Sequence, residues 1–183
     1  MGKVLSNFTN GWPGTPSRSV DEIILSMRNG SDGEIPFGSA VFFVAGQNAC
    51  EPFDPDYAAS YSMDNFIGIT VRSGDKTPNL FGSNEAVFND GDPVEILTRG
   101  AIVLQFAHGV DPGATVYIRK ADGAFVTNPG AEGTTLALTN VHVKTASDSE
   151  NCAEVVVLER NLLKAGCAQA RRPQPDCRNR KRS

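Results

Sequence analysis

The stretch GEIPFGSAVFF, residues 33–43, places a proline between two glycines just before a run of β-branched and aromatic residues. A similar pattern returns as GVDPGATVYI at residues 109–118 and, in a shorter form, as GDPVEIL at residues 91–97. Proline fixes the backbone φ angle and glycine permits a sharp turn, so the pattern is typical of a turn that leads into a strand. No candidate catalytic residue accompanies any copy. We therefore expect three strand starts at the rim of a β-structure, and because the copies differ in length we do not predict tandem repeats.

The rest of the chain repeats this alternation of short apolar runs and turn residues. Runs rich in Val, Ile, Leu, Phe and Thr are separated by Gly, Pro, Asn and Asp, which is typical of an all-β sandwich or barrel. Asp122-Gly123 lies between two of the runs and predicts a hairpin. We therefore expect a mostly β fold, a small β-barrel or sandwich, with strands near residues 20–28, 40–45, 66–72, 93–98, 101–106, 114–120, 124–127, 136–145 and 152–159.

Composition divides the 183 residues into three parts. Residues 1–19 are rich in Asn, Gly, Pro and Ser, and the prolines exclude a helix, so we expect an extended N-terminal arm. Residues 20–160 form the β-barrel or sandwich body. Residues 161–183 contain a short predicted helix at 161–170 and a basic C-terminal tail. We expect the arm to dock on a partner through contact residues Phe8, Trp12, Pro13 and Arg18.

Charge is distributed unevenly along the chain. The formal net charge is −4, yet residues 171–183 hold six basic residues and one acid, so the remainder carries −9. The basic residues of the tail are Arg171, Arg172, Arg178, Arg180, Lys181 and Arg182. A basic tail on an acidic body fits an acidic protein surface better than nucleic acid, because the body lacks a basic face. We expect no nucleic-acid partner. No apolar run reaches the roughly 20 residues that span a bilayer, and we expect no membrane partner.

Residues that carry catalysis are scarce. His108 and His142 each lie in a strand-like run without a Cys or carboxylate at metal-ligand spacing, so we expect structural roles for both. The sequence contains no nucleophile elbow, phosphate-binding loop or dinucleotide-binding glycine pattern. We expect no metal, no cofactor and no enzymatic activity, although a fold can bring together residues that are distant in sequence.

Two long segments, residues 47–65 and 73–92, contain aromatic residues that are unusual on a solvated surface. These side chains either fold back on the β body or contact a neighbouring subunit. They are Phe53, Tyr57, Tyr61, Phe81 and Phe88.

The four cysteines form no C-x-x-C pair, so a zinc site is not expected. Cys152 lies in a strand-like run and should pack as a small hydrophobic residue. Cys167 and Cys177 lie outside the strand-rich region, and Cys50 begins a long loop. We consider inter-subunit disulfides at Cys167, Cys177 and Cys50, and equally four free thiols, because the sequence does not give the distance between sulfur atoms.

The segment GWPGTPSRSVDEIILSMRNGSDGEIPFGSAVFF, residues 11–43, resembles the N-terminal region of structural cement, or head decoration, proteins of tailed bacteriophages. The later order FIGITVRS, DPVEILTRGAIVL, VDPGATVYI and DGAF fits the same family, and the resemblance covers roughly residues 8–160. The basic, cysteine-containing end after Asn161 is not part of that pattern.

The resemblance implies a β-rich protein that binds the outer surface of the head, contacts the major capsid protein and stabilises the expanded shell. It also implies a homotrimer at local threefold positions, located in the virion after synthesis in the host cytoplasm. The alternative is a carbohydrate- or receptor-binding β-module of a virion fibre or spike, because aromatic residues in long loops would also suit sugar stacking.

Overall fold

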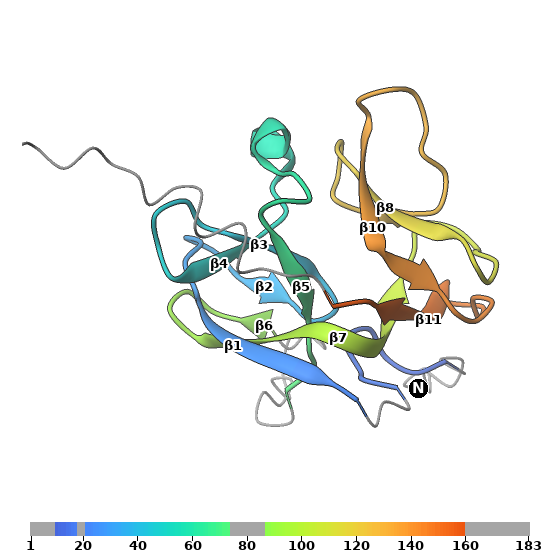
Figure 1. Cartoon of the computed structure of the whole chain (residues 1–183), viewed down its shortest axis with the longest axis horizontal. Coiled ribbons are helices and arrows are strands. Elements are labelled where there is room, and N and C mark those ends of the chain that lie inside the picture. The colour runs from blue at the N-terminus through green and yellow to red at the C-terminus, as the bar shows by residue number, and fades with distance from the viewer. Residues whose placement is uncertain (1–9, 18–20, 74–86, 160–183) are drawn as a thin grey trace, which may run out of the picture.

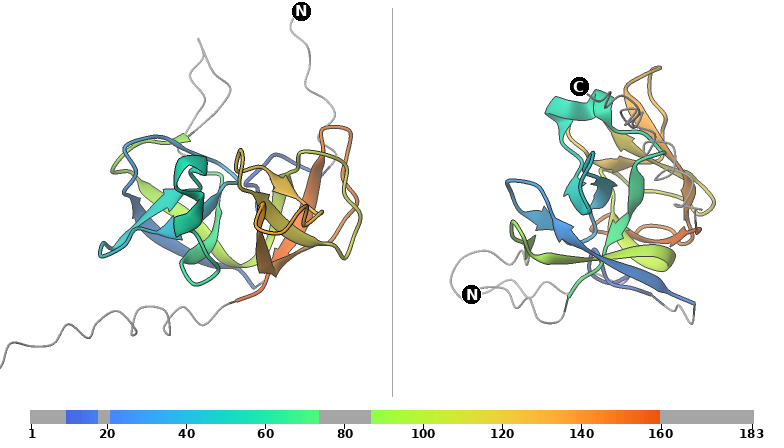
Figure 2. Two further views of the ribbon diagram at one scale, coloured as in Figure 1. Left: turned by 90° about the horizontal axis from the view of Figure 1, so that it is seen from above. Right: turned by 60° about the vertical axis from the view of Figure 1, so that its left-hand side comes forward.

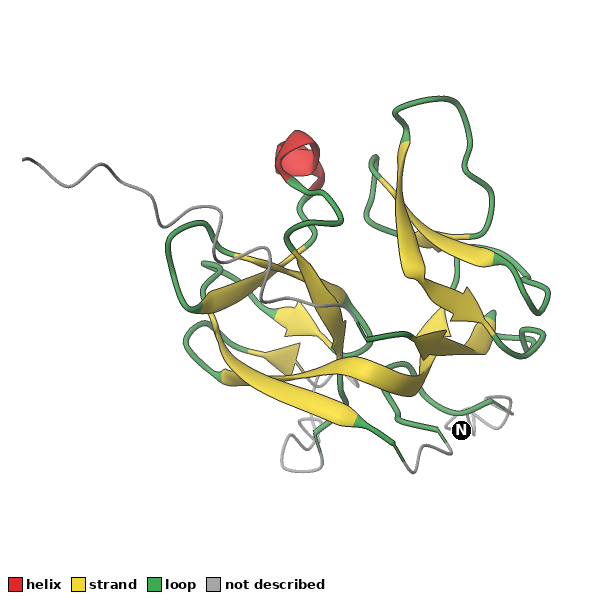
Figure 3. Ribbon diagram, viewed as in Figure 1, coloured by secondary structure: helices red, strands yellow, loops and turns green. Residues whose placement is uncertain are grey.

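Strands dominate the protein (Figure 3). The computed structural model describes residues 10–17, 21–73 and 87–159. The described part contains a single 3-10 helix, η1 (Pro55–Ser60), and no helix there is long and apolar enough to cross a membrane. The strands are β1 (Ile23–Asn29), β2 (Ile35–Pro36), β3 (Ala40–Phe43), β4 (Ala49–Pro52), β5 (Phe66–Thr70), β6 (Val87–Phe88), β7 (Pro93–Gln105), β8 (Thr115–Arg119), β9 (Phe125–Val126), β10 (Thr135–Val143) and β11 (Cys152–Val157).

Five strands close into a barrel. The order is β1-β4-β3-β5-β7, and the ring closes because β1 also pairs with β7 in antiparallel fashion. The pairing of β1 with β4 is parallel and involves only Arg28 and Asn29. The two-stranded sheet β2-β6 adds Ile35 and Phe88, both fully buried, to the apolar cluster of this barrel. The expected small β-barrel is therefore confirmed.

Strand β7 continues from the barrel into a second lobe, which lies beside the first (Figures 1 and 2). The first half of β7 pairs with β1 and β5, and residues Gly100–Gln105 pair with β11. The second sheet then runs β7-β11-β10-β8-β9. A bridge between Phe106 and Phe125 joins its last strand back to the end of β7. One strand thus belongs to both lobes.

The core consists of two clusters of buried side chains. The smaller cluster contains Met27, Val41, Cys50, Ile67 and Ile96 from the first barrel. The larger cluster spans both lobes, because Phe42 and Leu97 of the barrel pack with side chains of the second sheet such as Val155. The larger cluster therefore joins the two lobes, which explains why β7 is buried over most of its length.

The three proline-glycine patterns precede strands, as expected. A turn at Phe37–Gly38 precedes β3, a turn at Asp90–Gly91 precedes β7, and a turn at Pro112–Gly113 precedes β8. The hairpin at Asp122-Gly123 is also confirmed, since it joins β8 to β9.

Three details of the sequence interpretation were wrong. Residues 49–52, which include Cys50, were expected in a long loop but form strand β4, because they pair with β3 and β1. The runs 93–98 and 101–106 form one strand rather than two, because Gly100 adopts a φ of 130° and lets the backbone bend without leaving the sheet. His108 lies in a bend after β7 rather than in a strand, whereas His142 lies in β10.

Gly68 of β5 lies directly against the backbone of β7. A Cβ atom at this position would lie 2.2 Å from the carbonyl oxygen of Leu97, a backbone atom that cannot move without disturbing β7. We predict that Gly68→Ala lowers the free energy of unfolding by about 2 to 3 kcal/mol, as overpacking of a filled core does. Denaturant titration measures this change.

The matched control is Gly33→Ala, because no atom lies within 4 Å of the Cβ that this substitution adds. Its free energy of unfolding should stay within about 0.5 kcal/mol of the native value. Equal stability of the two variants would contradict the proposed close packing.

Candidate functional site

The described part of the N-terminal arm lies against the body of the same chain. The amide of Gly14 donates to the carbonyl of Val103, the amide of Val103 donates to Thr15, and the amide of Ser17 donates to Ala101. These hydrogen bonds use the edge of β7 opposite β11. Residues 14–17 therefore complete the hydrogen bonding of β7 where β1 has ended.

A turn at Trp12–Thr15 fixes the direction of the arm. The amide of Thr15 donates to the carbonyl of Trp12, and Gly14 has a φ of 79°. Gly14 faces Gly38, whose φ is 73°, and a Cβ on either glycine would lie 2.8 Å from the backbone nitrogen of the other. Two glycine turns from distant parts of the chain thus touch through their backbones, and a side chain at either position would separate them.

Trp12 is held in place but remains accessible. The guanidinium carbon of Arg72 lies 5.5 Å from the Trp12 ring centroid and 5.4 Å from that of Phe37. The cation thus contacts two aromatic rings, within the range where the attraction is significant. Trp12 is nevertheless 41% exposed. An oriented and exposed tryptophan is well suited to anchor a partner, since aromatic anchors dominate interface energetics.

Asn10 attaches the start of the described arm to the loop before β11. Its side-chain nitrogen donates to the carbonyls of Ala146 and Cys152 at 2.9 and 2.8 Å, and its amide donates to Asp148 at 3.3 Å. The sequence analysis did not select Asn10 or Arg72. No local signal identifies them, because their partners are at least 35 positions away in the sequence.

Of the predicted arm contacts, the structure describes Trp12 and Pro13. Pro13 is half-buried and lies against Gly38. Phe8 and Arg18 lie outside the described residues, as do the predicted helix at 161–170, the six basic tail residues and both Cys167 and Cys177.

Both described cysteines are buried free thiols. Desolvation raises the pKa of Cys50 to about 11 and, together with the carboxylates of Asp148 and Glu150, that of Cys152 to about 12. Thiols with raised pKa values form little thiolate, which is the reactive species. Cys152 packs as a small hydrophobic residue, as expected. Cys50 is fully buried, so its sulfur has no access to a neighbouring molecule while the barrel is closed.

Most of the described loop aromatics fold back on the body. Phe88 is 1% and Tyr61 is 6% exposed, and Phe53 packs against the larger core cluster with its ring centroid 4.9 Å from that of Tyr61. Tyr57 on η1 is the exception, at 66% exposed. Phe81 lies outside the described residues.

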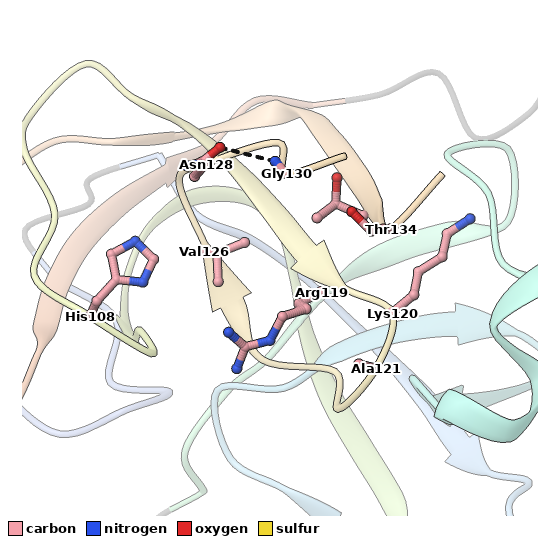
Figure 4. Close-up of a pocket in the computed structure, with 9 residues that line it drawn as sticks. His108, Arg119, Lys120, Ala121, Val126, Asn128, Gly130 and Thr134 are labelled. Carbon is pink, nitrogen blue, oxygen red and sulfur yellow. Dashed lines mark hydrogen bonds between the residues drawn. The ribbon is translucent and has the colours of Figure 1, made fainter. Parts of the chain in front are cut away.

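An open pocket of about 630 Å³ lies on the second lobe (Figure 4). Its nine lining residues include no carboxylate and no Phe, Tyr or Trp side chain. His108 and Lys120 stand on separate sides, and Arg119 is ion-paired with Asp122. The lining thus pairs no carboxylate with His108 for acid-base chemistry and offers none of the Phe, Tyr or Trp rings on which sugars usually stack. In the described part of the chain, no group of three His, Cys, Asp or Glu side chains could hold a metal ion.

Comparison with known families identifies the protein class. The family described as structural cement protein (E217 gp24/Pam3 gp6) matches residues 3–158, which include the arm, both lobes and the Gly14–Gly38 contact. The chain belongs to the phage structural cement protein family. This cement protein is accordingly a structural component of the virion that associates with the capsid shell.

Solved structures share the architecture of this cement protein. A chain of the capsid of Myoviridae phage XM1 superimposes with a TM-score of 0.60 at 17% identity, over 81% of this chain and 89% of that chain. The head fibre gp8.5 N base of bacteriophage phi29 has a TM-score of 0.38 at 10% identity, over 74% of this chain and 94% of that chain. That second likeness is too distant to support any argument. No curated protein matches the sequence.

The Gly14–Gly38 contact predicts how the arm can be released. In Gly38→Ala the new Cβ would collide with the backbone of Pro13 and Gly14, so amides of residues 10–17 should lose protection from hydrogen exchange. The control is Gly113→Ala, which places alanine at a similar φ of 87° with no atom within 4 Å. It carries the same left-handed strain, on the order of 1 kcal/mol, without the collision. Equal loss of arm protection in both variants would contradict the proposed role of the contact.

Proposed function

We propose that this cement protein binds the outer surface of the expanded head, contacts the major capsid protein and reinforces the shell without catalysing a reaction. The observation that carries the proposal is the exposed Trp12, held over Arg72 by an arm that is hydrogen-bonded to β7. A partner that covers Trp12 gains apolar burial without first having to order the ring. Preorganisation of this kind increases affinity because less conformational entropy is lost on binding.

The N-terminal arm is the proposed anchor on the shell or on a neighbouring subunit. Trp12 and Pro13 are its described members, and Phe8 and Arg18 are the further contacts that the sequence suggests. We propose in addition that the protein acts as a homotrimer at local threefold positions. The basis for the trimer is the resemblance in sequence order together with the exposed Tyr57 of η1.

The proposed non-enzymatic role is supported by the pocket chemistry. Neither His108 nor Lys120 has a carboxylate beside it in the pocket lining. A cement protein requires many weak contacts repeated over a lattice rather than one reactive site, since multivalency multiplies modest affinities.

The C-terminal tail is the proposed second attachment. Six basic residues would draw it to the acidic body of a neighbouring copy, and Cys167 or Cys177 would then form a disulfide between copies. In that step two thiols lose two protons and two electrons to an oxidant such as dissolved oxygen outside the host. Cys50 is left out of this proposal because it is fully buried.

Removing the tryptophan tests the anchor. Trp12→Ala should lower occupancy on expanded capsids without changing the thermal unfolding of the free protein, because Trp12 lies on the surface. Lost burial of this ring corresponds to about 2 kcal/mol per copy, or roughly thirtyfold in affinity. Quantitative gel analysis of purified decorated capsids, with unexpanded capsids alongside, measures the occupancy.

Leu158→Ala is the control for that experiment, since it removes another exposed apolar side chain, 50% exposed, that the proposal assigns to no contact. Unchanged occupancy of Trp12→Ala capsids would show that the arm is passive. Failure of the native protein to bind expanded capsids would reject the cement role itself.

Electrophoresis of virions with and without reductant tests the tail. We predict multimers that collapse on reduction, persist in Cys50→Ser and disappear in Cys167→Ser/Cys177→Ser. The alkylating reagent is present while the samples are denatured, because the buried Cys50 thiol, whose pKa is raised, becomes reactive only once the protein unfolds. A single monomer band in both lanes would reject the disulfide.

A further inference from the structure

Strand β1 has an open edge. Ile23 to Arg28 pair with β7 on one side, while on the other side β4 pairs only with Arg28 and Asn29. The amide and carbonyl of Asn29 bond toward β7, to Asp92 and Gly91. Because bonding direction alternates along an antiparallel strand, the backbone groups of Ile24 and Ser26 point to the opposite edge. No described residue hydrogen-bonds to them there.

The same segment exposes an unusual amount of apolar surface. Ile23, Ile24 and Leu25 are consecutive and are 39%, 45% and 37% exposed. An exposed apolar edge is a template for pairing with another strand, and proteins normally blunt such edges with lysine, proline or a covering loop. Here β1 has neither lysine nor proline in Ile23–Asn29.

The charges beside this edge are self-complementary. Glu22 and Arg28 are both exposed, and each lies three residues from Leu25. If two copies of β1 run antiparallel with Leu25 opposite Leu25 of the second copy, Ile24 faces Ser26 and Glu22 faces Arg28, twice by symmetry. This register also aligns the two outward-pointing backbone groups, since Ile24 and Ser26 form a hydrogen-bonded pair. A shift of the register by one residue would lose both the pairing of Glu22 with Arg28 and the hydrogen-bonded pair of Ile24 and Ser26.

We propose that β1 is a two-fold contact site at which two copies of this protein pair edge to edge. The ladder is short, from Ile24 to Ser26, because β4 occupies the edge from Arg28 onward. The side chains of Glu22 and Arg28 then close the contact at both ends. So short a contact is weak between free molecules and becomes strong only where copies are held close together.

On a capsid, this contact would connect cement proteins at neighbouring positions. If the proposed trimer interface does not cover β1, a two-fold pairing would join one trimer to the next across the shell surface. The link between neighbouring cement proteins on the shell rests on the proposed function. The pairing of two β1 strands does not depend on it, because this pairing is also tested on the free protein.

Site-directed cross-linking tests the register. The experiment uses protein that carries Cys167→Ser and Cys177→Ser. In this protein, Leu25→Cys places two thiols opposite each other across the two-fold axis. The Cα atoms of a non-hydrogen-bonded pair are about 4.5 Å apart, which is close enough for a disulfide. Oxidised glutathione serves as oxidant: the two thiols become one disulfide and the reagent becomes two reduced glutathiones. Ile23→Cys is the control, because its symmetry mate is four residues further along the antiparallel partner. We expect a dimer yield at least about tenfold higher for Leu25→Cys.

Charge reversal tests the complementarity in the same Leu25→Cys protein. Glu22→Arg and Arg28→Glu each place like charges opposite one another twice, and each should lower the dimer yield about tenfold. The double variant Glu22→Arg/Arg28→Glu restores opposite charges and should recover the yield to within about twofold.

The measurements are made on concentrated free protein and on decorated capsids. No Leu25→Cys dimer in either sample, or equal yields for Leu25→Cys and Ile23→Cys, overturns the proposal. Single charge reversals that leave the yield unchanged overturn the assigned register. Because capsid occupancy is scored separately, loss of cross-linking with normal occupancy rejects the two-fold contact and leaves the cement role intact.

Discussion

The structure depends on the pairing of β7 with strands of both lobes. Its first half lies between β1 and β5, and its second half lies between β11 and the arm residues 14–17. A one-residue slip anywhere along β7 would turn buried side chains to the surface in two sheets at once, so its register is strongly specified. Gly100 lets the strand change direction between the lobes, and the neighbouring Arg99 forms ion pairs with Asp21 beside β1 and Glu159 beyond β11. Both barrel closure and the second lobe therefore depend on this strand.

The arm shows how a proline- and glycine-rich segment can become part of a fold. It contributes few buried apolar side chains, and its position comes instead from backbone hydrogen bonds to β7 and the contact between Gly14 and Gly38. The hydrogen bonds to β7 pair backbone amides and carbonyls of the arm that would be costly to bury without a partner. The result is that Trp12 projects from a fixed point on the body although the surrounding sequence is polar.

Surface features rather than a cavity explain how this cement protein can act. The lining of the described pocket contains no carboxylate, whereas Trp12 and the edge of β1 expose apolar surface. Trp12 is held by Arg72 and the turn of the arm, and β1 is held by its pairing with β7. Each offers only a small contact area. Repetition over a lattice raises the local concentration of partners, so small contacts suffice where a solution complex would need a large one.

The sequence by itself determined the fold class, most strand positions and the turns, because short β-rich runs bounded by glycine and proline are local signals. It also determined the family through residue order. It did not reveal β2, β4 and β6, since strands of two to four residues show no clear periodicity. It also missed the continuity of β7, since an Arg-Gly pair in sequence looks like a turn. The contacts of Trp12 with Arg72 and of Gly14 with Gly38, the burial of Cys50 and the open edge of β1 were decided by tertiary structure alone. They depend on which strands become neighbours, and that is set by long-range pairing and shared burial rather than by any local pattern of residues.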